Sequence, residues 1–153
     1  EIRALFEKNA HSGIDADRSD CVSENSLDEG ISFVRQCAGK YGGIIVASGA
    51  IDLVSDGTSC YVIRNGKKEM ALVSGTGCQL SGLITAFIAS NRENLFESVA
   101  AAVCLMGVAG EIGAEHMQSY EGNAMYRNRI IDAVYYMNAE MLDRRAEYEM
   151  YQR

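Results

Sequence analysis

The residues best suited to chemistry form one short segment, Ser74-Gly75-Thr76-Gly77-Cys78. The apolar pair Leu72-Val73 precedes it and apolar residues at helical spacing follow it, which predicts a loop between a strand and a helix. Glycines let the backbone approach a ligand closely, and the first amides of a helix have no partner inside that helix. Such a helix start favours anions, and phosphate in particular. The segment therefore predicts a phosphate-binding loop that also presents the thiol of Cys78.

Two interpretations of this segment stay open on its glycines alone, an anion site and an ordinary tight turn before a helix. It lacks the Gly-Lys-Ser/Thr ending of a P-loop and the full Gly-x-Gly-x-x-Gly pattern of a dinucleotide fold. A cysteine nucleophile usually has a histidine close by. Neither histidine of the chain, His11 or His116, stands near Cys78 in the sequence. Anion binding is the favoured interpretation over covalent catalysis.

The elements that must position this loop follow an α/β pattern. Leu80, Leu83, Ile84 and Phe87 lie at helical spacing and predict an amphipathic helix directly after the loop. Two more helices are predicted downstream, an unusually small and apolar one over residues 95–116 and another that starts near residue 123 or 125. Upstream, the spacing of Ile31, Val34 and Ala38 predicts a helix that ends at Gly42-Gly43.

The strands of this pattern are short. Ile44–Ala47 is a continuous β-branched run, typical of a strand that is buried on both faces of a parallel sheet. Residues 51–56 predict a second extended piece. Cys60–Arg64 and Lys67–Val73 flank Asn65-Gly66, and Asn-Gly favours the two-residue turn of an antiparallel hairpin. After about Leu142 the chain becomes charged, which predicts a solvated tail.

Composition and charge exclude several classes of protein. The 153 residues are 48% hydrophobic, too apolar for a disordered segment. Fourteen Lys and Arg against 21 Asp and Glu give a net charge of −7, and no nucleic-acid partner is expected, because phosphate neutralisation needs clustered basic residues. The most apolar stretch, 98–112, is too short to span a bilayer, so no membrane partner is expected. Five cysteines without a Cys-x-x-Cys pair favour buried thiols in a reducing cytoplasm over disulfides or zinc ligands.

The stretch Val73–Ser81, Val-Ser-Gly-Thr-Gly-Cys-Gln-Leu-Ser, resembles the signature loop of the hydroxyethylthiazole kinases, ribokinase-like enzymes of thiamine salvage. Other segments resemble that family in the same order, up to about residue 138: Glu1–Leu5, Ser48–Asp52 with Asp56-Gly57, Gly107–Glu111 and Ile131–Tyr135. Two departures are visible. Ala50 stands where the family often has Glu, and Glu121–Tyr126 lacks the family's proline.

The resemblance implies a ribokinase-like three-layer α/β sandwich, with a mostly parallel sheet that includes the hairpin and with helices on both faces. It implies that residues 1–153 are the C-terminal portion of a single kinase domain whose upstream half is absent from this chain and is needed for activity. The expected reaction is the phosphorylation of the alcohol of 4-methyl-5-(2-hydroxyethyl)thiazole by ATP with Mg²⁺. The expected assembly is a homotrimer with sites between subunits.

The family's site residues carry over onto six positions. Gly75, Thr76, Gly77 and Cys78 would form the anion hole for the γ-phosphate, with Gly75 also near the thiazole alcohol. Cys78 stands where most ribokinase-like enzymes have an aspartate base, and a thiol is a poorer base for an alcohol, so it serves either as the base or only to position the hydroxyl. Ser48 would contact the nucleotide, and Glu1 would order Mg²⁺ through water.

Two alternatives remain. One is another ribokinase-like kinase, for hydroxymethylpyrimidine or a sugar, although such enzymes normally carry Asp at the position of Cys78. The other is a non-catalytic ligand-binding or assembly half-domain that keeps the anion loop without turnover.

Overall fold

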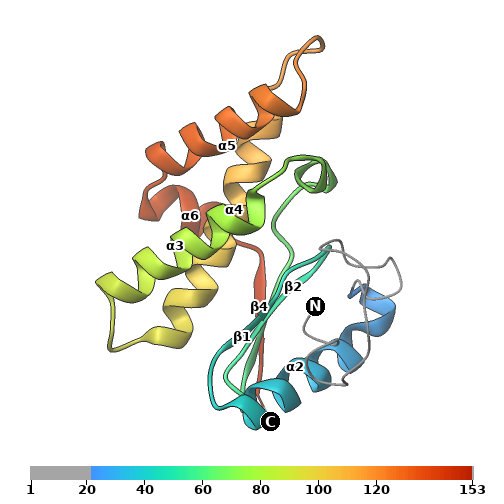
Figure 1. The fold of residues 1–153 in the computed structure, drawn as a ribbon, viewed down its shortest axis with the longest axis vertical. Helices are drawn as coiled ribbons and strands as arrows, with labels where there is room; N and C mark the ends of the chain where they lie inside the picture. The colour runs from blue at the N-terminus through green and yellow to red at the C-terminus, as the bar shows by residue number, and fades with distance from the viewer. Residues whose placement is uncertain (1–21, 153) are drawn as a thin grey trace. The chain divides into compact units, whose positions relative to one another are not determined.

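The computed structural model describes residues 22–152, which divide into two units (Figure 1). The first unit takes in the described chain up to Val62 and residues 150–152 at the other end. The second unit is Ile63–Glu149 and contains the predicted phosphate loop.

The first unit is built on one long helix, α2 (Leu27–Tyr41), which follows a single 3₁₀ turn, η2 (Glu24–Ser26). The apolar face of α2 packs against residues of the neighbouring strands; its buried members are Leu27, Ile31 and Val34, with Ile51, Leu53, Cys60 and Val62 opposite. The helix ends at Gly42, whose φ of 70° is left-handed and whose N–H donates to the carbonyl of Ala38. The predicted helix and its glycine end are confirmed.

Four strands form one sheet in the order β1-β2-β3-β4: β1 (Ile45–Ala47), β2 (Asp52–Ser55), β3 (Cys60–Ile63) and β4 (Tyr148–Tyr151). β1 and β2 are antiparallel, with Val46 opposite Val54. Only residues 48–51 connect them, and so short a connection reverses the chain, whereas a parallel crossover needs a dozen residues or more. The predicted mostly parallel arrangement is therefore wrong for these strands. β1 is also only half-buried, rather than buried on both faces.

The predicted hairpin around Asn65-Gly66 is also wrong. β3 ends at Ile63, and its neighbours in the sheet are β2 and β4, so no strand formed by residues 67–73 lies beside it. Residues Lys68–Leu72 form the 3₁₀ helix η3 instead. Asn65 is buried, and its side chain donates to the backbone carbonyl of Arg145, as described below. It is therefore not an exposed turn residue.

The second unit is a helical assembly whose centre is α4 (Leu95–Glu115). α3 (Thr76–Ser90) and α5 (Asn123–Tyr136) both pack against α4. These three helices confirm the three that the sequence predicts. Past Leu142 the chain is mostly exposed, as expected, but it is not a loose tail: it continues into α6 (Ala139–Arg145) and β4, and α6 also contacts α4.

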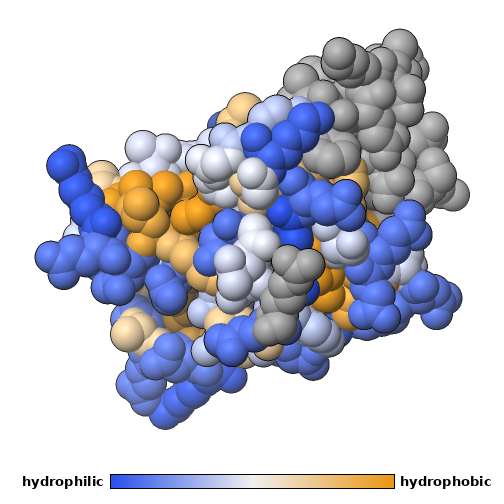
Figure 2. All heavy atoms as spheres, turned by 90° about the horizontal axis from the view of Figure 1, so that it is seen from below, coloured by the Kyte–Doolittle hydropathy of each residue, from blue (hydrophilic) through white to orange (hydrophobic). Residues whose placement is uncertain are grey.

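The apolar character of α4 is explained by its burial. With 21 residues it is longer than the apolar stretch that the sequence shows, and by length and composition alone it could cross a membrane. Two thirds of its most apolar window (67%) is buried inside the protein, as in the core helix of a water-soluble protein. On the face drawn in Figure 2, hydrophobic side chains form separate areas among hydrophilic ones.

Candidate active site

The predicted loop leads directly into α3, as the sequence indicates. Val73 is buried in the core of the second unit, whereas Ser74 and Gly75 are exposed. Gly75 immediately precedes the helix with φ 92° and ψ 3°, a left-handed conformation that costs glycine little and other residues much more. A methyl group at Gly75 would meet no atom within 4 Å, so its backbone conformation, rather than crowding, is what requires glycine.

The first amides of α3 are available to a ligand. The N–H of Gln79 makes the first bond of the helix, 3.0 Å to the carbonyl of Gly75, so the amides of Thr76, Gly77 and Cys78 have no acceptor inside the helix. No acidic side chain lies in this first turn. Positive partial charge at an open helix start, without a competing carboxylate, suits a phosphate group.

The side chains of the loop differ in exposure. Thr76 is half-buried, and its hydroxyl lies 3.4 Å from the carbonyl of Val73, which ties the helix start back to the core. Gly77 and Cys78 are exposed, and a methyl group at Gly77 would also meet open space. The structure thus brings the four predicted loop residues together on one accessible helix end.

The thiols fall into two groups among the described cysteines. Cys37, Cys60 and Cys104 are buried, as predicted for most of the five, and burial raises the pKa of the Cys60 thiol to about 11. Cys78 is free and exposed. It is therefore the described thiol that a ligand at the loop can reach.

Ser48, the expected nucleotide contact, lies in the first unit on the turn between β1 and β2, where its side chain is exposed. Asp52 holds this turn, because its Oδ1 accepts the N–H of Gly49 at 2.8 Å. Burial of the Asp52 carboxyl raises its pKa from 3.8 to about 6, against the smaller lowering effect of that hydrogen bond.

Asp52→Asn is expected to raise the stability of the protein at neutral pH by about 1–2 kcal/mol. Between pH 4 and pH 6 the folded protein holds a proton on Asp52 that the unfolded chain has lost, so stability falls as pH rises through this range. The asparagine keeps an acceptor for Gly49 but carries no charge. Urea unfolding from pH 4 to pH 8 measures the difference, which should vanish near pH 4. A constant difference across that range would contradict the assignment.

Two helices of the second unit, α4 and α5, hold the residues that directly precede the loop. The side-chain amide of Asn123, at the start of α5, donates to the carbonyl of Leu72 at 3.0 Å. Val73 packs with Met106 and Ala109 of α4 and with Tyr126 of α5. The two residues that precede the loop are therefore attached to both α4 and α5.

Glu1, the expected magnesium contact, lies outside the described residues. Within residues 22–152, no group of three His, Cys, Asp or Glu side chains is placed to hold a metal ion. The described residues thus offer amides for phosphate but no protein cage for Mg²⁺, and its ligation remains a prediction.

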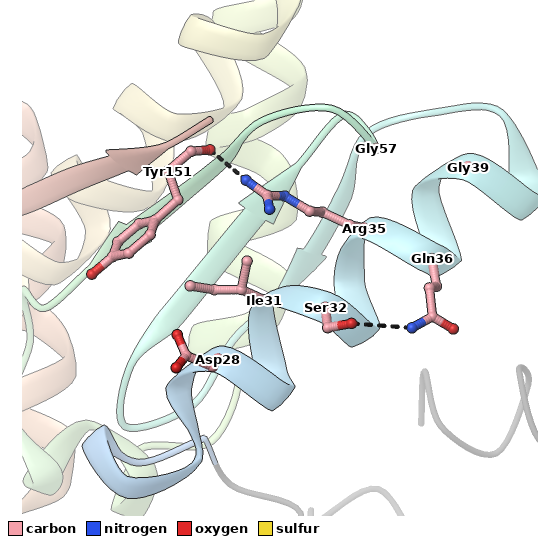
Figure 3. A pocket seen from close by; sticks show the side chains of 8 residues that line it. All are labelled: Asp28, Ile31, Ser32, Arg35, Gln36, Gly39, Gly57 and Tyr151. Atoms are coloured by element: carbon pink, nitrogen blue, oxygen red, sulfur yellow. Dashed lines mark hydrogen bonds between the residues drawn. The ribbon is translucent and has the colours of Figure 1, made fainter. Parts of the chain in front are cut away.

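A pocket of about 490 Å³ lies in the first unit, and none of the predicted site residues lines it (Figure 3). Arg35 of α2 points across it and donates from Nη2 to the carbonyl of Tyr151 at 2.6 Å. Its Nε is buried and has no partner among the described residues. Ser32 and Gln36, on the same helix, bind each other at 3.2 Å. These contacts join Arg35, Ser32 and Gln36 to other groups of the protein, and they indicate no particular ligand.

The sequence patterns did not predict the hydrogen bonds that Asn65, Glu111 and Asn123 make to distant parts of the second unit. The Asn-Gly pair was the available signal, but it also signals a hairpin turn. Glu111 offered a better one, because it is a carboxylate within the small, apolar residues of α4 and therefore needs a buried partner. Its partners are Asn65 and Gly66.

The family model described as "HK: Hydroxyethylthiazole kinase family" matches residues 1–140 of this chain. A hydroxyethylthiazole kinase of Clostridium acetobutylicum is 40% identical over 139 residues, which are 91% of this chain and 51% of that protein. "Hydroxyethylthiazole kinase 2" of Clostridium botulinum is 32% identical over 152 residues, 99% of this chain and 55% of that protein. The chain thus spans about half the length of the curated relatives it matches.

Among solved structures, a hydroxyethylthiazole kinase protein from Pyrococcus horikoshii OT3 is similar, with a TM-score of 0.75 and 23% sequence identity. The match covers 84% of this chain and 49% of the other. This likeness confirms the α/β, ribokinase-like fold class that the sequence predicts.

Proposed function

We propose, on the premise that this chain belongs to the hydroxyethylthiazole kinase family, that it supplies the phosphate-binding part of a kinase. The reaction is transfer of the γ-phosphoryl group of ATP to the alcohol of 4-methyl-5-(2-hydroxyethyl)thiazole, a step of thiamine salvage. The single observation that carries the proposal is the open start of α3, where left-handed Gly75 precedes the helix and the amides of the first turn have no acceptor inside it.

The geometry suits phosphoryl transfer because that reaction needs positioning and charge stabilisation more than covalent chemistry. The alcohol oxygen forms a bond to the γ-phosphorus while the bond to the β–γ bridging oxygen breaks, and ADP leaves with the electron pair. Negative charge spreads over the equatorial oxygens, and the amides of Thr76, Gly77 and Cys78 can donate to them. The exposed Cys78 side chain would orient the alcohol or take its proton.

Other parts of the proposal depend on residues and subunits away from this loop. Ser48 would contact the nucleotide through its hydroxyl, and Glu1 would order Mg²⁺ through water. Mg²⁺ would neutralise charge on the ATP phosphates when bound. A homotrimer in the cytoplasm, with upstream chain completing the thiazole pocket, is the assembly that the family resemblance supports.

The test of this function is a kinase assay on the protein expressed from its complete gene. The thiazole alcohol, hydroxymethylpyrimidine and a sugar panel are each offered with MgATP, and ADP formation is followed. Turnover of the thiazole alcohol alone is expected. Turnover of a different alcohol would replace the substrate assignment, and ATP binding without any turnover would favour the non-catalytic alternative.

Cys78→Asp is expected to keep or increase the rate, because a carboxylate at this position accepts the alcohol proton at least as well as a thiol. Cys78→Ala is the matched variant, and we expect it to lower kcat about tenfold or more, since general-base and positioning effects are at least that large. Steady-state kinetics with the thiazole alcohol measures both. Complete loss of activity in Cys78→Asp would instead indicate a thiolate nucleophile.

A further inference from the structure

The buried side chain of Asn65 joins three segments of the second unit that lie far apart in the sequence. Its Nδ2 donates to Glu111 Oε1 of α4 at 3.2 Å and to the carbonyl of Arg145 at 2.8 Å. Its Oδ1 accepts the N–H of Glu147 at 2.7 Å. Both amide protons and the carbonyl oxygen are thus used, and the side chain is only 6% exposed. Rotating the amide by half a turn would set its NH₂ against the N–H of Glu147, so the orientation is fixed.

The C-terminal segment that Asn65 binds is itself tied to α4. Arg145 donates from both terminal nitrogens to the carboxylate of Glu115, at 2.8 and 3.0 Å. The N–H of Arg64 donates to the carbonyl of Glu147 at 2.9 Å, directly beside the Asn65 contacts. The family model ends at residue 140, so the bonds to Arg145 and Glu147 involve chain beyond it.

From Asn65 a continuous series of contacts runs to the phosphate loop; we call residues 65–73 the strap. The N–H of Gly66 donates to Glu111 Oε1 at 2.8 Å. Met70 lies directly over Gly110 of α4, where a methyl group would collide with its sulfur. Leu72 and Val73, at the far end, are held by α5 and the core as described above. The strap therefore has fixed points at both ends and at its middle.

We propose that Asn65 is a positioning residue for the phosphate loop. Its amide fixes the start of the strap against α4 and the C-terminal segment, and the strap in turn sets the place of Gly75–Cys78. The C-terminal segment thereby contributes to phosphate affinity although it does not touch the loop's ligand. The inference rests on the proposed function only in taking the phosphoryl groups of ATP as that ligand.

Asn65→Asp tests this, because aspartate keeps the shape and the acceptor for Glu147 but loses both donors and faces the Glu111 carboxylate. In the protein from the complete gene, we expect the KM for ATP to rise about tenfold, the scale of losing donors to a charged partner. Hydrogen–deuterium exchange at residues 79–82, the first hydrogen-bonded amides of α3, should become at least about fivefold faster, as the start of the helix loses its fixed place. Adding Glu111→Gln to this variant restores a donor opposite the introduced carboxylate and should recover part of both losses.

Two variants on α6 provide the milder test and its matched control. Arg145→Ala removes both hydrogen bonds to Glu115. It should raise the exchange rate at residues 79–82 and the KM for ATP, each by less than Asn65→Asp does. Arg144→Ala removes an exposed ion pair with Glu140 on the same helix and should change neither quantity. If Asn65→Asp does not fold, Arg145→Ala decides.

A merely structural role would lower the melting temperature and the active fraction while leaving KM and exchange at residues 79–82 unchanged. That result overturns the proposal. If the wild-type protein phosphorylates no thiazole alcohol, the proposed function fails, but exchange at residues 79–82 still decides the role of Asn65.

Discussion

Replacing Gly75 with alanine is expected to lower kcat/KM for ATP about 100-fold, while the helices stay folded. With φ at 92°, an L-residue at this position is strained by about 1–2 kcal/mol. The backbone relieves the strain by rotating, which turns the following amides away from the phosphate oxygens. Loss of one such donor is known to cost a factor of about 10²–10³ in rate. Steady-state kinetics and circular dichroism on the protein from the complete gene measure the two quantities.

Gly82→Ala is the matched control for this change. Gly82 lies in the same helix α3, is exposed, and a methyl group there would meet no atom within 4 Å. We expect unchanged kcat/KM and a gain in stability of up to about 1 kcal/mol from the better helix former. A Gly75→Ala protein with wild-type kcat/KM would show that the loop does not bind the transferred phosphate.

Gly107→Ala is expected to lower the free energy of unfolding by about 2–3 kcal/mol, despite the higher helix propensity of alanine. A methyl group at Gly107 would lie 2.6 Å from both the Cβ and the carbonyl oxygen of Asn65. Because Asn65 is held by three hydrogen bonds, its backbone cannot yield without breaking them. Urea unfolding with and without the substitution measures the loss.

Gly110→Ala, one helical turn further along α4, is the informative comparison. There the methyl group would come even closer to the sulfur of Met70, but a methionine side chain is flexible and can move aside. We therefore expect a smaller loss of about 1 kcal/mol. A larger loss at Gly110 than at Gly107 would contradict the view that the rigidity of the neighbour sets the cost.

The main helices could be predicted because each one is specified locally. In α2 and α3 the apolar residues recur at helical spacing, and Gly42 or Asn91 ends the helix close to where the pattern stops. The small, apolar residues of α4 indicated its burial for a physical reason that the structure confirms. Gly107 and Gly110 have no room for a side chain, because Asn65 and Met70 lie directly against them.

The sheet could not be predicted in the same way. An apolar run such as Ile44–Ala47 shows that a strand forms but does not show which strand pairs with it. β4 illustrates this best, because its charged and aromatic residues look like a solvated tail, yet it joins the sheet next to β3. Pairing between segments separated by more than 80 residues leaves no periodic signal in either one.

What the sequence determined by itself is the glycine-containing loop before α3. Its glycines and the apolar spacing after it are local, and they place a left-handed residue and unpaired amides at the start of α3 without help from the rest of the chain. What only the tertiary structure decided is how that loop is held. Asn65 reads as a turn residue until Glu111 and Arg145, 46 and 80 residues away, are seen to bind its amide. A buried amide must satisfy its hydrogen bonds, and only the folded chain shows which distant groups do so.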